Sequence, residues 1–277
     1  MGQPQASFAA AIIGIVALAT HAACGAAAER PARETRIVSC EDGHVSDTPN
    51  GRLVNNMWNK QAAVGAYEQC LLMRGEPAAP LFGWSWEWPI ESETLLAYPQ
   101  ALFGWKPWNG GVTTNSALPI QISSIETLEL SYRVHTTAQG KYNFAATMWI
   151  TRSGRTSDQP NPADISADVN VWMNNRGVPL SGEQVATARI ANIDVQVWHA
   201  ADIGDASGAN SNRWQHVVYL AQAVPASGTL DLAAFVRDAV DRGILSPAHY
   251  VSSVELGNEI VSGSGETWIE ALTLEVH

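Results

Sequence analysis

Residues 144–150 read FAATMWI and residues 167–174 read ADVNVWMN, and these two stretches decide the fold class. In each, every second residue is apolar, which is the period of a half-buried β-strand. Met148 and Val169 would then face a core. The faces that point away from it carry a different set, namely Ala145, Thr147, Trp149, Asp168, Asn170 and Trp172. The two stretches predict a sheet with one core face and one functional face.

The rest of the chain has the same β-rich texture. Residues 127–134 (TLELSYRV) alternate similarly, and clusters of Pro, Gly, Asn and Ser separate further short segments, as in sandwiches and barrels. One segment differs, because residues 230–243 (LDLAAFVRDAVDRG) repeat apolar side chains at helical spacing. Asp231 is its expected N-cap and Gly243 its expected stop. We therefore expect an all-β sandwich of two antiparallel sheets with one packed α-helix.

The size and charge of the chain limit the classes of partner that it can bind. The chain has 277 residues, 46% of them hydrophobic, and a formal net charge of -11. The excess of acid disfavours nucleic acid and anionic lipid as partners, since both bind clustered Lys and Arg. A neutral polymer suffers no such repulsion. No linker or internal repeat interrupts residues 37–277, so we expect one domain there.

The N-terminus has the composition of an export signal. Residues 8–23 form an uncharged apolar run that is short for a membrane span and ends in small residues. We expect residues 1–24 to be a signal peptide and residues 25–36 a flexible lead-in. The protein would then be secreted, either outside the cell or into a periplasm. A lipoprotein signal, with a lipid on Cys24, is the alternative.

Export also bears on the remaining cysteines. Once Cys24 has left with the signal or carries a lipid, Cys40 and Cys70 remain as one pair in an oxidising compartment. A disulfide between them closes a loop of about 30 residues and would contribute on the order of 3 kcal/mol in the chain-entropy model. Two unpaired buried thiols are the alternative.

The chain has eleven tryptophans, a high number for its length, and their positions indicate a carbohydrate site. Flat indole rings cover the apolar faces of sugars and leave the hydroxyl groups free for hydrogen bonds. In GWSWEWP three tryptophans alternate, as a ladder on one face of a strand: Trp84, Trp86 and Trp88. Three more lie beside polar residues of the functional face: Trp58, Trp149 and Trp172. About half should pack in the core instead, and we expect this of Trp198, Trp214 and Trp268.

The sequence contains no motif typical of a metal, phosphate, dinucleotide or serine-nucleophile site. The seven histidines lack the spacing of metal ligands, and no nucleophile elbow, phosphate loop or dinucleotide fingerprint is present. We expect no metal and no cofactor. Carboxylates remain, because hydrolysis of a glycoside with retention needs a nucleophile and an acid about 5–5.5 Å apart. The candidates are Asp168, which shares a face with Asn170, and Glu259, among glycines that allow close backbone approach of a ligand.

At these residues the chain resembles glycoside hydrolase family 12, the retaining endo-β-1,4-glucanases and xyloglucanases on a β-jelly roll. The resemblance covers nearly the whole mature chain, with Cys40 and Cys70 matching the disulfide loop at the start of the family's domain. Five motifs follow in the family's order: VNNMWN (54–59), YPQALFGWKPW (98–108), KYNFAATMWI (141–150), ADVNVWMN (167–174) and VELGNEIVSGSG (254–265).

The resemblance assigns roles to particular residues. Glu259 matches the general acid/base, and Asp168 stands where the family has its nucleophilic Glu. Thr147 stands where the family has an Asp that supports the nucleophile, and its hydroxyl could donate a hydrogen bond to Asp168. Asn170 replaces a Met and could add a second donor. In the first motif, the sugar-binding positions are Asn56 and Trp58.

Three functions follow from these observations. The first is an endo-acting glycosidase on β-1,4-glucan or xyloglucan, secreted, monomeric and without a membrane span, which uses Asp168 and Glu259 and binds sugar on Asn56, Trp58 and the ladder. The second is a glucan-binding, lectin-like relative that has lost its chemistry through Asp168 and Thr147. The third is a structural envelope protein without a sugar ligand, which requires the ladder to be wholly buried.

Overall fold

The computed structural model describes residues 1–2, 34–76, 78–222 and 224–277. The chain forms two compact units, and one of them, Glu34–His277, contains every helix and strand that the structure describes. Apart from residues 1–2 and 34–36, the expected signal peptide and lead-in lie outside the described residues. Within the described part of the chain, no helix has the length and apolar character needed to cross a membrane.

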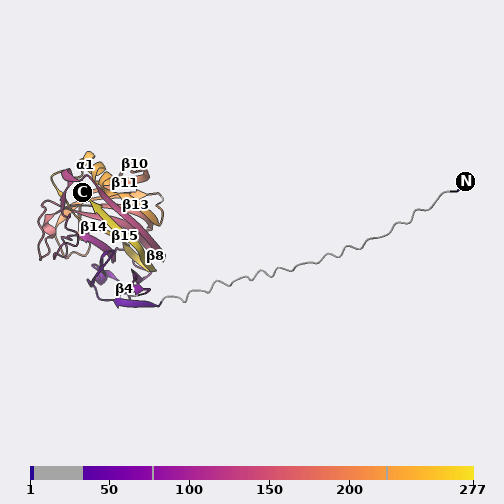
Figure 1. Ribbon diagram of the computed structural model, residues 1–277. Coiled ribbons are helices and arrows are strands. Elements are labelled where there is room, and N and C mark those ends of the chain that lie inside the picture. The colour runs from indigo at the N-terminus through magenta and orange to yellow at the C-terminus, as the bar shows by residue number, and fades with distance from the viewer. Residues whose placement is uncertain (3–33, 77, 223) are drawn as a thin grey trace. The chain divides into compact units, whose positions relative to one another are not determined.

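One long strand, β8 (Leu128–Thr151), organises the sheet. Its first half pairs with β15 (Ile260–Val276), and its second half lies between β9 (Ile165–Arg176) and β14 (Tyr250–Gly257). Figure 1 shows β8, β14 and β15 side by side. Because β8 alternates along its whole length, a single strand can supply both layers of a sandwich.

The other strands extend each half of β8. On the side of its first half are β13 (Ser227–Asp231) and, beyond β15, β5 (Leu81–Trp88), β4 (Glu68–Arg74) and β1 (Thr35–Ser39). On the side of its second half, β14 leads to β7 (Ile120–Gln121), β6 (Gln100–Gly104), β3 (Gly51–Val54) and β2 (Val45–Thr48). Beyond β9 follow β12 (Arg213–Ala221), β11 (Ile193–Gly204) and β10 (Glu183–Ile190). Short 3-10 helices span Lys60–Ala62, Ile122–Ser124 and Pro162–Asp164.

The main core lies between the two halves of this curled sheet. Trp84 and Leu130 from the first half belong to the same buried cluster as Met148 and Val169 from the second. The predicted core faces of residues 144–150 and 167–174 are thereby confirmed, as is the all-β sandwich. One pairing departs from the antiparallel expectation, because β12 runs parallel to β9.

The predicted helix is α1 (Leu232–Asp241). The Asp231 side chain accepts a hydrogen bond from the backbone N–H of Ala234 at 2.9 Å, which confirms it as the N-cap. Gly243 has a φ of 73° just beyond the helix, a left-handed conformation that suits glycine. The buried stripe that packs α1 against the sheet is Leu232, Ala233, Phe235, Val236 and Ala239.

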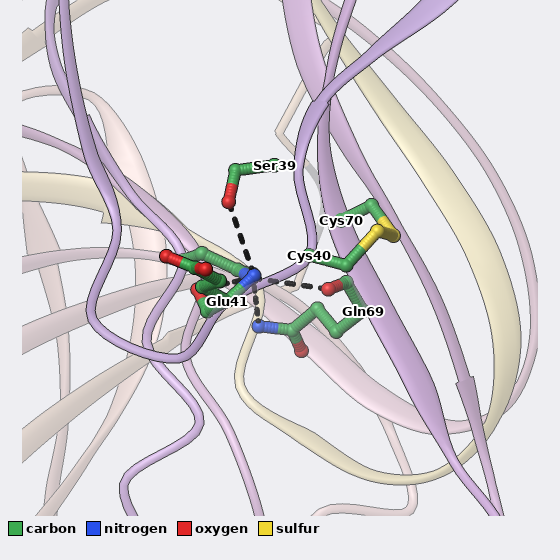
Figure 2. Close-up of a disulfide and its surroundings, with 6 residues drawn as sticks. Ser39, Cys40, Glu41, Gln69 and Cys70 are labelled. Carbon is green, nitrogen blue, oxygen red and sulfur yellow. Dashed lines mark hydrogen bonds between the residues drawn. A yellow bond between two sulfur atoms is a disulfide. The ribbon is translucent and has the colours of Figure 1, made fainter.

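The predicted disulfide between Cys40 and Cys70 is present (Figure 2). It joins the end of β1 to β4, and the chain around it is held by Asn55, whose Nδ2 donates to the carbonyls of Glu41 and Gln69 at 2.9 and 3.0 Å. Residues 54–59 therefore start from an anchored segment, which fixes where Asn56 and Trp58 emerge.

Candidate active site

The polar side chains predicted for the functional face lie on two adjacent strands, β8 and β9, and β14 lies on the other side of β8. In the β8–β9 pairing Trp149 is opposite Asp168 and Thr147 opposite Asn170, and β14 places Glu255 opposite Thr147. We call this surface of β8, β9, β12 and β14 the site face. Its members are deeply set, since Asp168 is 7% exposed and Asn170 1%.

Asp168 is held by three hydrogen-bond donors. Trp214 Nε1 donates to Oδ1 at 3.1 Å, and Asn170 Nδ2 donates to Oδ2 at 2.9 Å. His216 Nδ1 lies 2.9 Å from Oδ1 and 3.0 Å from Oδ2. These donors fix the orientation of the carboxylate and offset negative charge on it, and a nucleophile must be positioned in this way.

Thr147 reaches Asp168 only through Asn170. The Thr147 hydroxyl donates to Asn170 Oδ1 at 2.7 Å, and Asn170 Nδ2 continues to Asp168. Tyr98 begins the chain, because its hydroxyl donates to Thr147 Oγ1 at 3.1 Å. Burial, with the charge of Glu255, raises the pKa of Tyr98 well above its usual value, so the phenol keeps its proton. The expected donor from Thr147 to Asp168 is thus wrong, whereas the donor from Asn170 is present.

Glu259 is fixed in the turn between β14 and β15 by Asn143. The Asn143 side chain donates to the Glu259 carboxylate and accepts from the Glu259 N–H at 3.0 Å. The neighbouring Asn258 donates to the Asn143 carbonyl at 2.8 Å and accepts from Trp84 Nε1 at 2.9 Å. Both sides of this turn are therefore held rigid, which a positioned acid needs.

The glycines near Glu259 serve the backbone rather than a ligand. A Cβ on Gly257 would collide with the carbonyl of Pro99 and the side chain of Gln100, and one on Gly263 would collide with the backbone of β8. The expectation that a ligand approaches these glycines is wrong, because the group that approaches them is the neighbouring strand or loop.

The pKa of Glu259 is raised to about 7, and burial is the main cause. The hydrogen bond from Asn143 and the charge of His216 lower the pKa, whereas the charge of Asp168 raises it. Glu259 is thus within electrostatic reach of both. A carboxylic acid that keeps its proton near neutral pH beside a charged carboxylate is the pairing that general acid catalysis requires.

A third carboxylate, Glu255, is fully buried on the site face. It accepts from Lys106 Nζ at 2.9 Å and from Gln100 Nε2 at 3.3 Å. Burial raises the pKa of Glu255, and Lys106 opposes that shift. Asn56 Nδ2 lies 3.5 Å from Gln100 Oε1, so the expected sugar-binding Asn56 joins this network.

The tryptophan ladder is not on the site face. Trp84, Trp86 and Trp88 of β5 are 0%, 3% and 3% exposed and belong to the main core. Trp88 Nε1 donates to Gln69 and its ring stacks on Tyr67 at 4.4 Å. The prediction that the ladder binds sugar is wrong, because its face points between the layers and the intervening Ser85 and Glu87 face outward.

Other tryptophans gather beside Asp168. Trp108, Trp149 and Trp214 pack edge to face, with ring centroids 5.4, 5.4 and 5.8 Å apart. Trp214 was expected in the core and is buried, at 7% exposed, but its indole packs in the Asp168 site and donates to that carboxylate. Trp198 was also expected in the core, but it is half-buried and packs against the buried cluster that contains Trp172.

The remaining tryptophans follow the sequence more closely. Trp268 is buried as predicted, with the Arg74 guanidinium 4.1 Å above its ring. Trp149 is half-buried on the site face, and Trp172 is 2% exposed there. Trp58 is half-exposed, next to Asn56. Of the expected sugar-binding rings, Trp58 and Trp149 remain open to a ligand.

The family model of "Glycosyl hydrolase family 12" matches residues 51–277. The chain belongs to glycosyl hydrolase family 12. Endoglucanase S of Pectobacterium parmentieri is 28% identical to it over 228 residues, which cover 81% of each protein. The chain is a glycoside hydrolase, and the family resemblance of the sequence is confirmed.

Solved structures agree on the fold. A native family 12 xyloglucanase from Bacillus licheniformis has a TM-score of 0.75 and 24% identity, covering 88% of this chain and all of that one (100%). Endoglucanase cel12A from Rhodothermus marinus has a TM-score of 0.68 and 25% identity, covering 86% and 98%. The β-jelly roll expected from the resemblance is confirmed.

Several residues of this site were not singled out as site residues from the sequence, among them Asn143, Trp214, His216 and Glu255. Asn143 and Glu255 lie inside quoted motifs, so their place on a polar strand face was a usable signal. Trp214 and His216 alternate with Val218 in residues 213–221 (RWQHVVYLA). That pattern predicts a shared face, but not that the face lies beside Asp168.

Proposed function

We propose that this family 12 chain is a secreted, endo-acting hydrolase that cleaves β-1,4-glucan or xyloglucan with retention. The observation that carries the proposal is the difference between two carboxyl groups within electrostatic reach. Asp168 is bound by three donors that stabilise its charge, while the pKa of Glu259 lies at about 7. Such a difference separates a nucleophile from an acid.

The reaction takes two steps. Glu259 gives its proton to the glycosidic oxygen while an Asp168 oxygen attacks the anomeric carbon, which forms a glycosyl ester and releases the leaving sugar. Glu259, now ionised, takes a proton from water as that water attacks the same carbon. The ester bond breaks, Asp168 regains its charge, and the sugar keeps its original anomeric configuration.

The substrate class rests on the relatives and on the site face. Endoglucanase S and the two solved enzymes carry glucanase or xyloglucanase names, and a B. licheniformis family 12 xyloglucanase is known with a ligand. We place sugar units against Trp58 and Trp149, with Asn56 as a polar contact. Thr147 and Asn170 then support the nucleophile rather than touch sugar.

Release of reducing ends tests the proposal. The purified protein is incubated with xyloglucan, mixed-linkage glucan or carboxymethylcellulose, and the anomer formed first is followed by NMR. We expect β-anomer product, with loss of activity in Glu259→Gln and Asp168→Asn. Glu270→Gln, an exposed glutamate on β15, is the matched control and should keep full activity. No reducing ends at high enzyme loading would refute the proposal.

The second candidate is a glucan-binding protein without hydrolysis. Both Asp168 oxygens are engaged by donors, and its side chain is one methylene shorter than Glu, which favours this alternative. Retardation in glucan-containing gels without reducing ends would establish it. Activity gained in the Asp168→Glu, Thr147→Asp double variant would then show descent from an enzyme.

The burial of the ladder meets the condition for an envelope protein without ligand, and unchanged tryptophan fluorescence with xyloglucan-oligosaccharides would support that third function.

Export is part of the proposal. The Cys40–Cys70 disulfide supports an oxidising compartment. Mass spectrometry of the mature N-terminus distinguishes the outcomes: cleavage near residue 24 without lipid supports a secreted enzyme, and a lipid on Cys24 supports an anchored one.

A further inference from the structure

His216 stands next to Asp168 because β12 pairs in parallel with β9. In that pairing β12 places His216 directly opposite Asp168, so both side chains point to the same face. His216 is 8% exposed and Asp168 7%. The imidazole ring and the carboxylate are therefore both shielded from solvent, and the two steps of the proposed reaction assign no role to the ring.

The contact is a two-centred hydrogen bond. Nδ1 lies 2.9 and 3.0 Å from the two oxygens of Asp168. Because an ionised carboxylate only accepts, the proton between them belongs to Nδ1. Among the described residues, Nε2 makes no hydrogen bond of its own. The ring is therefore fixed by Asp168 on one side, and Asp168 is fixed by the ring.

The charges around His216 favour the protonated ring. Burial lowers the pKa of His216, but the charge and hydrogen bond of Asp168 raise it, and the pKa lies above 6.5; the charge of Glu259 adds to this only when Glu259 has lost its proton. From β11 the opposing residue is Ala200. On β8 and β14 the site face carries Trp149, which is neutral, and Glu255, which is paired with Lys106.

We propose that His216 is a positioning residue of the hydrolase: as an imidazolium in contact with both oxygens of Asp168, it orients that carboxylate for attack while Glu259 retains its proton. The inference rests on the proposed function. Burial is the main cause that raises the pKa of Glu259, and the charge of Asp168 adds to it. A cation in contact with Asp168, and only within electrostatic reach of Glu259, stabilises negative charge on Asp168 more than on Glu259.

The same geometry accounts for the departures from the family pattern. Where family 12 has an Asp beside its nucleophilic Glu, this chain has Thr147. The Thr147 hydroxyl donates to Asn170, and Asn170 in turn donates to Asp168. A carboxylic acid that shares a proton with the nucleophile is absent at that position. His216 approaches Asp168 from the opposite strand and supplies a donor with a full charge.

Variants of His216 separate charge from packing. His216→Phe removes the donor and should lower kcat on the order of 100-fold, as expected for a misplaced reacting group, with little change in KM. His216→Asn keeps a neutral donor and should lose less. Since the charge of His216 lowers the pKa of Glu259, both variants should move the alkaline limb of the kcat/KM profile to higher pH. His199→Asn, whose ring contacts Gln215 instead, is the matched control and should change neither quantity.

A second measurement does not depend on turnover. In ¹⁵N-histidine NMR of the wild type, both ring nitrogens of His216 should be protonated at neutral pH, and Asp168→Asn should lower its titration point. A neutral His216, or His216 variants with wild-type rates and pH profiles in an active retaining enzyme, would overturn the role of His216 alone. An inverted product would overturn it too, because Asp168 would then orient Nε2 as a base for water. An inactive wild type overturns the proposed function itself.

Discussion

Asn170 donates from Nδ2 to Oδ2 of Asp168 at 2.9 Å, two residues along the same face of β9. The Asn170 carbonyl oxygen meanwhile accepts from Thr147 at 2.7 Å, and Thr147 accepts from Tyr98 at 3.1 Å. Thr147 and Asn170 each donate one hydrogen bond and accept one in this chain, which ends on the carboxylate of Asp168. The Tyr98 hydroxyl also lies 3.1 Å from the carbonyl of Ala145. Thr147 and Asn170, two of the three positions at which this chain departs from the family pattern, work as one unit.

Asn170→Met should therefore lower activity even though Met is the residue of the family pattern. It removes a hydrogen bond to a charged group and leaves the Thr147 hydroxyl without its acceptor, a loss of roughly 10- to 100-fold in kcat/KM. The rate is measured on soluble xyloglucan, with the melting temperature recorded in parallel. Thr147→Val should show part of the same loss, and Thr147→Ser, which keeps the hydroxyl, should show little. Equal rates for Asn170→Met and the wild type would contradict this account.

The raised pKa of Glu259 predicts a pH limit on the reaction. The acid loses its proton around a pKa of about 7, so kcat/KM should fall above neutral pH along a limb that reports this group. Initial rates on xyloglucan across the neutral range measure it. A limb that stays in place when His216 is replaced would assign it to another group.

The same group should make stability depend on pH. In the unfolded chain Glu259 ionises around its usual 4.5, and in the native protein only around 7. Between these values the native state binds the extra proton, so this contribution is fully present below 4.5 and lost as pH rises through 7. The loss is on the order of 3 kcal/mol. Urea unfolding should show that Glu259→Gln removes this part of the pH dependence, and the exposed Glu270→Gln does not.

Lys106 and Glu255 form a fully buried ion pair, with side chains 5% and 0% exposed. Lys106→Met leaves an uncompensated carboxylate and should cost about 3–5 kcal/mol of unfolding free energy. Adding Glu255→Gln should recover part of the loss. The matched control is Lys141→Met, since Lys141 pairs with Glu93 at the surface with side chains 37% and 80% exposed, and it should cost about 0–1 kcal/mol. Equal losses from the two lysines would show that burial is not the cause.

Much of the site face follows from periodicity alone. The alternation of residues 144–150 and 167–174 predicted which side chains share a face, and the pairing of β8 with β9 joins those faces. Sequence could not supply the neighbour on the far side of β9. The parallel β12 begins 37 residues after the end of β9, by the bounds Arg176 and Arg213, and no local pattern sets such a long-range pairing.

The prediction that the tryptophan ladder binds sugar was wrong for a different reason. Alternation shows that Trp84, Trp86 and Trp88 share a face, but tryptophan suits both a core and a sugar site. The intervening residues carry the decisive signal. Ser85 is half-buried and Glu87 exposed, and a charged residue on a half-buried strand marks the solvent face. The opposite face is then the core.

Trp86 and Trp58 should therefore respond to replacement in opposite ways. Trp86 is 3% exposed and packs on Tyr142 at 5.9 Å between ring centroids, so Trp86→Ala should cost about 3–5 kcal/mol of stability. In the folded fraction it should bind xyloglucan-oligosaccharides as the wild type does. Trp58→Ala should unfold at nearly the wild-type urea concentration but weaken oligosaccharide binding roughly 30-fold, the effect of removing one aromatic anchor. Calorimetry and urea unfolding on the same samples separate the two effects. Weaker binding by Trp86→Ala at full folding would return the ladder to the sugar site.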